Sequence, residues 1–339
     1  MKKFRVGIIG CGNMGGLYDE RGIGRGAVYT HAGMYSHFKE FEISAAADLD
    51  RKRLSGFVRH WRAKRAYRSY ADMLRAEKLD VVSIATPDET HTQILKDVLR
   101  INRPRIVFTE KPLALNAEEG LRIRDLARKL GVRIVVDYVR RWDVRHRLIK
   151  KMIEKGSLGD IISVSGYYVR GLRHNGCQLI NLIQYICGKI VSVTAIDPLP
   201  SGSSGSNESL SLRCLVKPDI PCYILPLDRK GYKFSAFELD IFGSKGRLRL
   251  DATGSAAELY FVSNDKRFPN FKYLKSGKLA GSATYGTALL CAGREMISFL
   301  KGGKSITRNT VEESIRDLAV IDGAFRSASL RNRPVPVAD

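Results

Sequence analysis

Short apolar runs alternate with amphipathic stretches through the first half of the chain. The apolar runs are almost continuous and end in glycine or polar residues; they cover residues 4–9, 42–47, 80–85, 105–108 and 132–136. Amphipathic stretches lie between them, such as Thr90–Arg100 and Ala117–Leu130, and Gly131 follows the second as a C-cap. Apolar strands separated by helices predict a parallel sheet that is covered on both faces. We therefore expect an α/β domain of the nucleotide-binding kind.

The second half of the chain has a different pattern, with many strands and few helices. The expected strands are residues 161–170, 191–197, 210–217, 222–227 and 237–242, with a loop over 198–207 and a tight hairpin turn at Lys245-Gly246. Two helical stretches, Tyr285–Lys301 and Val311–Leu330, close the chain. We expect an α+β domain with a large open, mostly antiparallel sheet. The predicted domains are residues 1–137 and 138–339.

Length and composition agree with two soluble domains. The chain has 339 residues, of which 44% are apolar and 27% charged, as in globular proteins. No stretch reaches the roughly 18 apolar residues that a membrane span needs. The N-terminal run is broken by Gly7, Gly10 and Gly12, so it is better interpreted as a buried strand than as a signal peptide. We expect no membrane association.

The cysteines favour a reduced, cytoplasmic protein. The six cysteines form no C-x-x-C pair, and no histidine stands at zinc-like spacing from them. Such residues are typical of small buried side chains. We expect no metal site.

The charge is the unusual quantity, at +22 from 57 Lys and Arg against 35 Asp and Glu. The densest run is Arg51-Lys52-Arg53 followed by Arg59, Arg62, Lys64, Arg65 and Arg68. Helical spacing would spread these side chains around a solvated face. A basic surface of this kind usually serves only to keep the protein soluble, although it can also attract an anionic cofactor or substrate. Nucleic acid is the weakest candidate partner.

A glycine motif follows the first predicted strand. Gly10-Cys11-Gly12-Asn13-Met14-Gly15 is G-x-G-x-x-G between a strand and a helix, where backbone N–H groups meet a pyrophosphate. Asp48 ends the second strand, and a carboxylate there binds both ribose hydroxyls and favours NAD over NADP. Arg51 and Lys52 follow closely, so NADP stays possible. Residues 16–30 resemble an inserted loop, and its Arg21 and Arg25 either reach phosphate or substrate or lie in solvent.

Two further motifs follow the fourth and fifth strands of the expected sheet. They are Ala85-Thr86-Pro87 with His91, and Thr109-Glu110-Lys111-Pro112. Ligands in such folds bind beyond the carboxyl ends of the strands, so Lys111 is expected on the nicotinamide side. An ammonium group there can assist proton transfer at a carbinol. A surface lysine before a turn is the alternative.

The ordered set of motifs resembles the Gfo/Idh/MocA family of oxidoreductases. The set comprises G-x-G-x-x-G, A-T-P-x-x-x-H, E-K-P, Tyr138-x-Arg140-Arg141, Gly156-x-x-Gly159, the segment 242–248 and Arg331-Asn-Arg-Pro-Val335. The resemblance implies a Rossmann domain followed by an open-sheet substrate domain that builds homodimers or homotetramers. It also implies an NAD(P)-dependent reaction at a carbon of a sugar, cyclitol or nucleotide sugar. The cofactor residues implied are Gly10, Gly12, Asn13, Met14, Gly15, Asp48, Thr86, Pro87, His91, Glu110 and Lys111.

The chain departs from the family at a second catalytic element, D-x-x-x-H-x-x-D. His174, Gln178 and Asn181 stand at the three polar positions, on one helical face. Gln and Asn do not exchange protons near neutral pH, whereas His does. In one account Lys111 and His174 share the proton relay, with Gln178 and Asn181 orienting the substrate. In the other, redox chemistry is impaired and the chain is a cofactor- or sugar-binding protein.

The leading hypothesis is an NAD(P)-dependent dehydrogenase or reductase of a sugar-like secondary alcohol or ketone. Hydride would pass between the substrate carbon and nicotinamide C4. The candidate catalytic residues are Lys111, His174 and Gln178, and the candidate substrate residues are Lys111, Arg140, Tyr168, Arg173, His174, Gln178 and Asn181. A redox-independent lyase or glycosidase that uses NAD transiently is a third interpretation.

Overall fold

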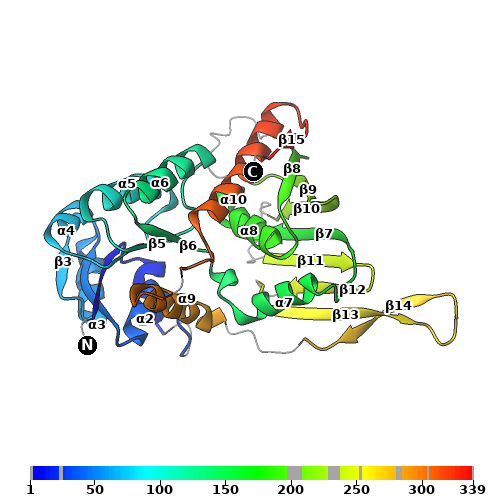
Figure 1. Ribbon diagram of the computed structural model, residues 1–339, viewed down its shortest axis with the longest axis horizontal. Coiled ribbons are helices and arrows are strands. Elements are labelled where there is room, and N and C mark those ends of the chain that lie inside the picture. The colour runs from blue at the N-terminus through cyan, green and yellow to red at the C-terminus, as the bar shows by residue number, and fades with distance from the viewer. Residues whose placement is uncertain are drawn as a thin grey trace. The chain divides into compact units, whose positions relative to one another are not determined.

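The computed structural model describes residues 3–22, 26–196, 208–227, 237–251, 254–279, 285–303 and 305–337. Contacts divide the chain into two compact units. The first comprises Met1–Asp143 with Thr284–Ile315, and the second comprises Val144–Ala283 with Arg316–Asp339. We describe each unit by itself; Figure 1 labels their elements.

The first unit contains a six-stranded sheet in the order β3-β2-β1-β4-β5-β6. Its strands are β1 (Phe4–Ile9), β2 (Phe41–Ala47), β3 (Arg65–Tyr67), β4 (Val81–Ile84), β5 (Ile106–Glu110) and β6 (Arg133–Asp137). Every neighbouring pair is parallel. The chain order reverses between β1 and β4, and this switch point is where open α/β sheets bind ligands. The predicted parallel α/β domain is confirmed.

Helices connect these strands, and four of them begin where a side chain caps their first turn. They are η1 (Asn13–Leu17), α1 (Tyr18–Glu20), α2 (His31–His37), α3 (Arg51–Trp61), α4 (Tyr70–Ala76), η2 (Asp88–Thr90), α5 (His91–Asp97), η3 (Val98–Asn102) and α6 (Ala117–Lys129). Thr30, Asp50, Ser69 and Asn116 accept a first-turn backbone N–H at the starts of α2, α3, α4 and α6. The predicted helices over 90–100 and 117–130 are therefore present.

A helix from near the end of the chain belongs to the first unit. The helix α9 (Tyr285–Leu300) shares a buried apolar cluster with α2, which includes Met34, Tyr35, Leu289 and Met296. Gly293 lies so close to Phe38 that an added Cβ would be 2.5 Å from its ring. The contacts therefore place residues 284–315 with the nucleotide-type sheet, whereas the sequence pattern assigned them to the domain 138–339.

The second unit contains a nine-stranded sheet in the order β14-β13-β12-β11-β7-β10-β9-β8-β15. Its strands are β7 (Ile161–Tyr168), β8 (Ile190–Ala195), β9 (Leu212–Val216), β10 (Ile220–Pro226), β11 (Phe237–Gly243), β12 (Gly246–Asp251), β13 (Ala256–Asn264), β14 (Lys272–Gly277) and β15 (Val335–Pro336). The pair β7–β10 is parallel and the others are antiparallel. The predicted large, mostly antiparallel sheet is confirmed.

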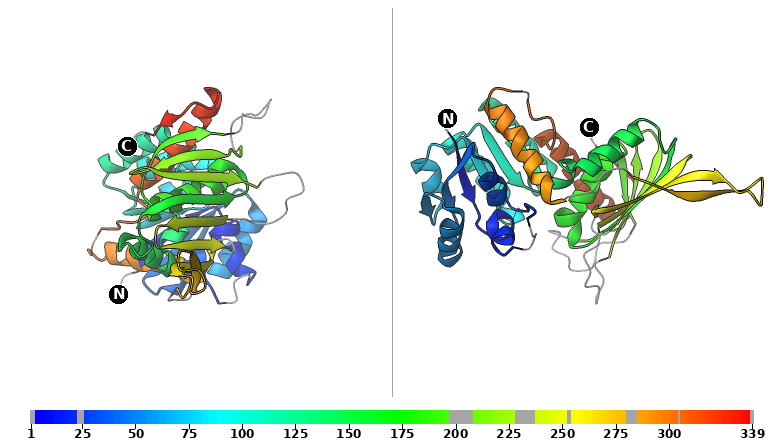
Figure 2. Two further views of the ribbon diagram at one scale, coloured as in Figure 1. Left: turned by 90° about the vertical axis from the view of Figure 1, so that its right-hand side faces the viewer. Right: turned by 90° about the horizontal axis from the view of Figure 1, so that it is seen from below.

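Among the described residues, the helices of this unit pack on one face of the second sheet (Figure 2). They are α7 (Val144–Glu154), the π-helix η5 (Gly171–Gly176), α8 (Cys177–Ile186) and the later part of α10 (Val311–Ser329). An added Cβ at Gly166 of β7 would lie 2.9 Å from Leu179 of α8, which shows how closely helix and sheet pack. Figure 2 (left) shows the strands of this sheet face-on, with the helices behind them.

Some predictions about individual elements are wrong. The basic run was expected to be helical throughout, but α3 ends at Trp61 and Arg65–Tyr67 form the edge strand β3. Arg62 takes a left-handed conformation that ends α3, and Arg65–Tyr67 then pair in parallel with Ala45–Ala47. The hairpin turn lies one residue earlier than predicted, because Gly243 pairs with Gly246 across residues 244–245. The predicted loop over 198–207 lies outside the described residues.

Candidate cofactor and catalytic site

The carboxyl edge of the parallel sheet carries most of the predicted cofactor residues. Gly10 follows β1, Asp48 follows β2, Thr86 follows β4, and Glu110 with Lys111 ends β5. Parallel strands present their carboxyl ends on one edge, so these residues share one side of the unit. The first sheet therefore brings the glycine motif and the Glu-Lys-Pro element to the two sides of its switch point.

The glycine loop has the geometry of a pyrophosphate site. Gly10 has a φ of +92°, and a Cβ on Gly15 would stand 2.1 Å from the Gly10 carbonyl oxygen, so both positions require glycine. A Cβ on Gly12 meets nothing within 4 Å, which leaves that side open to a ligand. The helix η1 begins at Asn13, so its first N–H groups have no partner within the helix. The residues present fit a dinucleotide phosphate.

Asp48 is tied into this loop. Its carboxylate accepts the Cys11 N–H at 2.8 Å and the Asp50 N–H at 2.8 Å. It also pairs with Arg53, whose Nε lies 3.1 Å from Asp48 Oδ2. The Asp48 side chain is 8% exposed, whereas Arg53 is 41% exposed. Asp48 thus lies beside the glycine loop with a guanidinium next to it, and its role in ribose binding stays a prediction.

The inserted loop is anchored at its base by one carboxylate. Asp19 accepts the backbone N–H of Tyr29 at 3.0 Å and of Thr30 at 2.9 Å, together with the Thr30 hydroxyl at 2.7 Å. Of the two arginines that the sequence suggested for this loop, Arg21 is exposed and Arg25 lies outside the described residues. Asp19 therefore fixes the turn from which α2 begins.

The residue that follows Lys111, Pro112, is held in place by a buried histidine. The Lys111–Pro112 peptide is cis. His91 is buried and bridges two carbonyl oxygens: its Nδ1 lies 2.6 Å from the Pro112 oxygen and its Nε2 lies 2.9 Å from the Thr86 oxygen. His91 therefore joins the two motifs A-T-P and E-K-P rather than facing solvent, and Lys111 is half-buried beside them.

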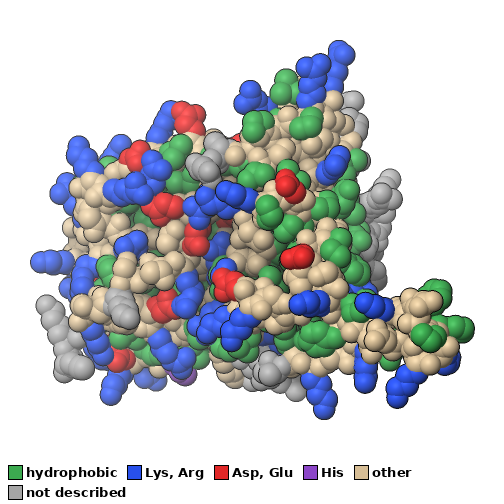
Figure 3. Space-filling view, turned by 45° about the vertical axis from the view of Figure 1, so that its right-hand side comes forward, with side chains coloured by type: hydrophobic (Ala, Val, Ile, Leu, Met, Phe, Trp, Pro, Cys, Tyr) green, Lys and Arg blue, Asp and Glu red, His purple; other side chains and the backbone are tan. Residues whose placement is uncertain are grey.

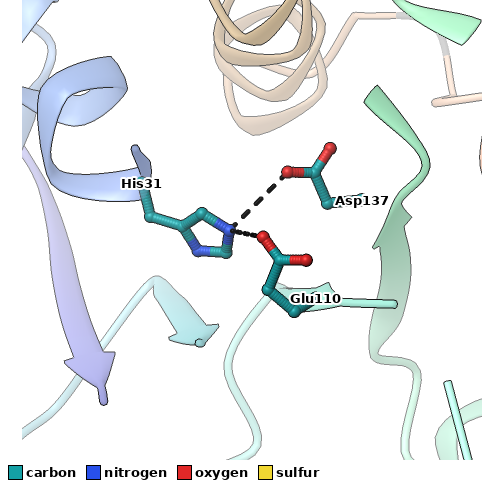
Figure 4. Close-up of side chains that lie close together, drawn as sticks. All are labelled: His31, Glu110 and Asp137. Atoms are coloured by element: carbon teal, nitrogen blue, oxygen red, sulfur yellow. Dashed lines mark hydrogen bonds and ion pairs between the residues drawn. The ribbon is translucent and has the colours of Figure 1, made fainter. Parts of the chain in front are cut away.

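The residue that precedes Lys111, Glu110, belongs to a buried cluster of ionisable side chains. His31 Nε2 lies 3.3 Å from Glu110 Oε1 and 3.7 Å from Asp137 Oδ2, as Figure 4 shows. The other ring nitrogen, Nδ1, lies 2.7 Å from the Ser83 hydroxyl, which also accepts a hydrogen bond from Tyr35. Three elements, α2, β5 and β6, thus supply side chains that meet around one imidazole nitrogen.

The charges in this cluster shift one another's pKa values. Burial acts against the charged ring, but the Asp137 and Glu110 carboxylates raise the pKa of His31 to about 9. Burial raises the pKa of Asp137 to about 6, with Glu110 adding to the effect. Burial acts to raise the pKa of Glu110, but the hydrogen bond and charge of His31, together with the charges of Lys111 and His91, lower it overall. Near neutral pH the cluster holds a protonated imidazole and at least one carboxylate.

Sequence reasoning missed His31 and Asp137 as site residues. The rule that points to the carboxyl ends of strands also applies to β6, and Asp137 is its last residue. His31 follows the inserted loop and carries no periodic signal. Among the described residues, His31, Glu110 and Asp137 are the group of His, Cys, Asp and Glu close enough to share a metal ion, although no metal site was expected.

The second unit holds the other predicted residues, and several are used within it. Tyr168 is fully buried, and its hydroxyl exchanges hydrogen bonds with the backbone N–H and C=O of Leu210, both at 2.9 Å. Arg173 Nη1 lies 3.3 Å from Asp322, and its guanidinium stacks over the Phe325 ring at 4.7 Å. These contacts give both side chains a structural role in this unit.

The residues predicted to form the second catalytic element differ in burial and in hydrogen-bond partners. Asn181 is buried and donates to Asp317 at 2.6 Å. Gln178 donates to Asn175 at 3.2 Å, and His174 is half-buried on η5. Arg140 lies in the first unit, buried in the short helix Val139–Arg141 after β6. The proton-transfer and substrate roles of His174 and Gln178 stay predictions.

The charge is spread over the surface. Figure 3 shows Lys and Arg side chains distributed over the visible face with Asp and Glu among them, rather than gathered in one patch. Many basic side chains are also paired locally, such as Lys64 with Glu42 and Arg75 with Asp72. Within the described residues, every helix is too short or too polar to traverse a lipid bilayer.

Comparison with known protein families gives a match over the parallel sheet of the first unit. Residues 4–138 match the family model described as "Oxidoreductase family, NAD-binding Rossmann fold", which carries the name GFO_IDH_MocA. Over this region the chain is similar to the Gfo/Idh/MocA family. The rhizopine catabolism protein MocA of Rhizobium meliloti is 30% identical over 168 residues, and the inositol 2-dehydrogenase of Rubrobacter xylanophilus is 27% identical over 168 residues. Each alignment covers 49% of this chain, and 47% and 44% of the two relatives.

Solved structures of other proteins share the fold over the whole chain. Levoglucosan dehydrogenase in complex with NADH superposes with a TM-score of 0.81 at 16% identity and full coverage of both chains. The WlbA dehydrogenase from Bordetella pertussis, in complex with NADH and UDP-GlcNAcA, gives a TM-score of 0.76 at 20% identity and full coverage of both chains. In sequence, however, the chain spans about half the length of the curated relatives it matches.

Proposed function

We propose that this protein is an NAD-dependent oxidoreductase of the Gfo/Idh/MocA family that acts on a secondary alcohol or ketone of a sugar, cyclitol or nucleotide sugar. The observation that carries the proposal is the position of two elements in one unit. The open glycine loop after β1 and the Glu110–Lys111 element after β5 lie at the carboxyl edge of one parallel sheet, around its switch point.

The cofactor would be held by residues already in place. The N–H groups at the start of η1 would meet the pyrophosphate beside Gly12, and Asp48 would accept hydrogen bonds from the ribose hydroxyls. The nicotinamide supplies hydride acceptance or donation when it is bound. Because Arg53 pairs with Asp48, the negative charge that would repel a 2′-phosphate is partly balanced, so NADP is a second cofactor to test.

Lys111 is the residue that would move the proton at the substrate oxygen. Its backbone is held by the contacts of Glu110 with His31 and of Pro112 with His91. A lysine fixed in this way can give or take the proton of a carbinol with little reorganisation. His174 is the predicted partner of Lys111 in this step, and Gln178 would orient the substrate by hydrogen bonds. We do not expect Asn181 to contact the substrate, because its side-chain amide already donates a hydrogen bond to Asp317.

The substrate class is inferred from the named relatives. Their names refer to a cyclitol, an anhydrosugar and a sugar nucleotide. All three are polyhydroxylated rings with a secondary alcohol. The positive charge of this chain favours a substrate that carries a phosphate, and competition by such compounds should then weaken in salt.

The experiment combines cofactor binding with a substrate panel. Isothermal titration calorimetry measures NAD and NADP binding, and nicotinamide absorbance follows turnover with myo-inositol, levoglucosan and UDP-sugars in both directions. The proposal predicts NAD binding and turnover of at least one compound. Binding of NAD and of a sugar without any redox change would instead support the binding protein. Retention of cofactor with non-redox conversion would support the lyase or glycosidase.

A homodimer or homotetramer through the second sheet is part of the proposal. The strands β7–β14 present an open face that carries paired charges such as Arg247 with Asp240. The hairpin β13–β14 exposes Phe268 and Phe271 at 57% and 67%, and large exposed apolar side chains favour an interface. Light scattering should show an oligomer that Phe268→Ser with Phe271→Ser weakens; a monomeric wild-type protein would contradict it.

A further inference from the structure

Two buried carboxylates face the same nitrogen of His31, at distances that hydrogen bonds do not explain. Glu110 Oε1 lies 3.3 Å from Nε2, and Asp137 Oδ2 lies 3.7 Å from it (Figure 4). A hydrogen bond between charged groups is usually about 2.7–2.9 Å long, and a separation of 3.7 Å is beyond any hydrogen bond. A proton on Nε2 therefore bonds weakly to Glu110 and leaves Asp137 without a hydrogen bond from the ring.

Asp137 is the least satisfied of these three side chains. Its carboxylate stands at the end of β6, is 2% exposed and points at the His31 ring. Within the part of the chain that the structure describes, Asp137 Oδ1 is buried and has no hydrogen-bond partner. A buried carboxylate without such partners is strongly unfavourable. A bound cation would supply the interaction that Asp137 lacks.

The three side chains are spaced like the ligands of one metal ion. One nitrogen or oxygen atom from each of them lies within 4.8 Å of the other two. Zinc binds histidine nitrogen and carboxylate oxygen at about 2.0–2.2 Å, so two donors on one tetrahedral ion lie about 3.4 Å apart. The separations of 3.3 and 3.7 Å from Nε2 lie on either side of this value. The cluster therefore needs little rearrangement to enclose an ion.

The other nitrogen of the ring has the partner that a metal-binding histidine needs. His31 Nδ1 lies 2.7 Å from Ser83 Oγ, which also accepts a hydrogen bond from the Tyr35 hydroxyl. A hydroxyl oxygen has two lone pairs, so Ser83 can accept the Nδ1 proton as well. With the proton on Nδ1, the lone pair of Nε2 faces the two carboxylates. Hydrogen bonds of this kind fix the tautomer of histidine ligands in metal sites.

We propose that His31 Nε2, Glu110 and Asp137 form a binding site for one divalent transition-metal ion, with Zn²⁺ as the best match. A donor set that includes imidazole suits zinc better than magnesium or calcium, which prefer oxygen ligands alone. A divalent ion would balance the charges of both carboxylates, whereas a proton on the ring balances only one. The ion would join α2 to the ends of β5 and β6. This site is independent of the redox function proposed above.

The test is equilibrium dialysis of metal-free protein against Zn²⁺, followed by elemental analysis. The wild type should bind one equivalent per chain. Ser83→Ala keeps all three ligands and should weaken binding by about 10- to 100-fold, and loss of a ligand in Asp137→Asn should weaken it further. His60→Gln, at an exposed histidine of α3, is the matched control and should bind Zn²⁺ as the wild type does. A wild type that binds no Zn²⁺, or unchanged affinity in Asp137→Asn, would overturn the proposal.

Two measurements on the wild-type protein keep the test decisive if a variant does not fold. The Tm should rise when Zn²⁺ is added, because the three ligands come together only in the folded chain. Anomalous diffraction at the zinc absorption edge should then place a peak among the three side chains. A zinc peak at another position alone would assign the binding to that position and contradict the proposed site.

Discussion

Each unit of this protein buries carboxylates, but it surrounds them with different partners. In the first unit, Glu110 and Asp137 face the imidazole of His31, which can carry a charge. In the second unit, Asp317 accepts hydrogen bonds from the side-chain amides of Asn181 and Gln184, at 2.6 and 2.8 Å, and these amides stay neutral. The first arrangement therefore responds to pH, whereas the second joins α8 to α10 at any pH near neutrality.

The difference bears on which part of the family pattern we propose for catalysis. The Glu-Lys-Pro element is intact and is held from both sides by histidines. At the second element, where the family has acid and base residues, Asn181 forms part of the protein core. A polar residue at the expected position on a helix face can thus serve packing instead of substrate binding.

The largest expected effect would come from filling the open side of the glycine loop. Gly12→Val adds a side chain where no atom lies within 4 Å, so it should leave the Tm unchanged and weaken NAD binding about 100-fold or more. Calorimetry measures the Kd. Gly15→Ala is the contrasting variant, because its Cβ would lie 2.1 Å from Gly10 and should lower the Tm. Equal NAD affinity in Gly12→Val would remove this loop from the site.

The hydrogen bonds from Asn181 and Gln184 to Asp317 should contribute to the free energy of unfolding. Asn181→Ala removes one of the donors to buried Asp317 and should reduce the free energy of unfolding by about 2–4 kcal/mol. Urea unfolding measures this change. If Asn181 instead orients the substrate, the variant would keep its stability and show a raised KM.

The charged cluster of the first unit should make stability depend on pH. The pKa of His31 is raised to about 9 in the folded protein, so its stabilising effect is complete below the unfolded value of 6.5 and is lost as the pH rises through 9. The free energy of unfolding should fall by about 2–3 kcal/mol across this range. In His31→Gln the slope should be absent. An equal slope in both proteins would assign it to another group.

The smallest expected effect concerns the choice between the two nicotinamide cofactors. Arg53→Ala removes the exposed guanidinium beside Asp48 and should change stability by less than about 0.5 kcal/mol. The Kd for NADP should rise by about threefold or more, while that for NAD changes little. Titration with both cofactors at low salt measures the ratio. A parallel rise for both would mean that Arg53 serves only to orient Asp48.

The local sequence pattern predicted those strands and helices whose apolar residues are buried against elements close to them in the sequence. The runs 4–9 and 132–136 correspond to β1 and β6, and the stretch 117–130 corresponds to α6. The return of α9 to the first unit could not be predicted, because its apolar face fits either sheet until α2 is seen beside it. The strands β13 and β14 were also missed, since their side chains are largely exposed.

The glycine motif and Lys111 could be predicted as site residues because fixed spacings relate them to strand ends. His31 and Asp137 could not be paired from sequence, since 106 positions separate them and only the sheet order brings α2 over β5 and β6. Tyr168 and Arg173 were placed in the site by residue type, but Tyr168 is fixed by the backbone of Leu210 and Arg173 by the side chain of Asp322. Residue type alone does not show which neighbour uses a polar group.

The most direct test of the account is the rate of NADH formation by the wild type and Lys111→Ala, side by side with a substrate found on the panel. Both proteins should bind NAD equally and unfold at similar temperatures. The account predicts that kcat falls by at least about 100-fold in Lys111→Ala, because the variant lacks the ammonium group proposed to move the substrate proton. A folded Lys111→Ala protein with wild-type kcat would contradict it.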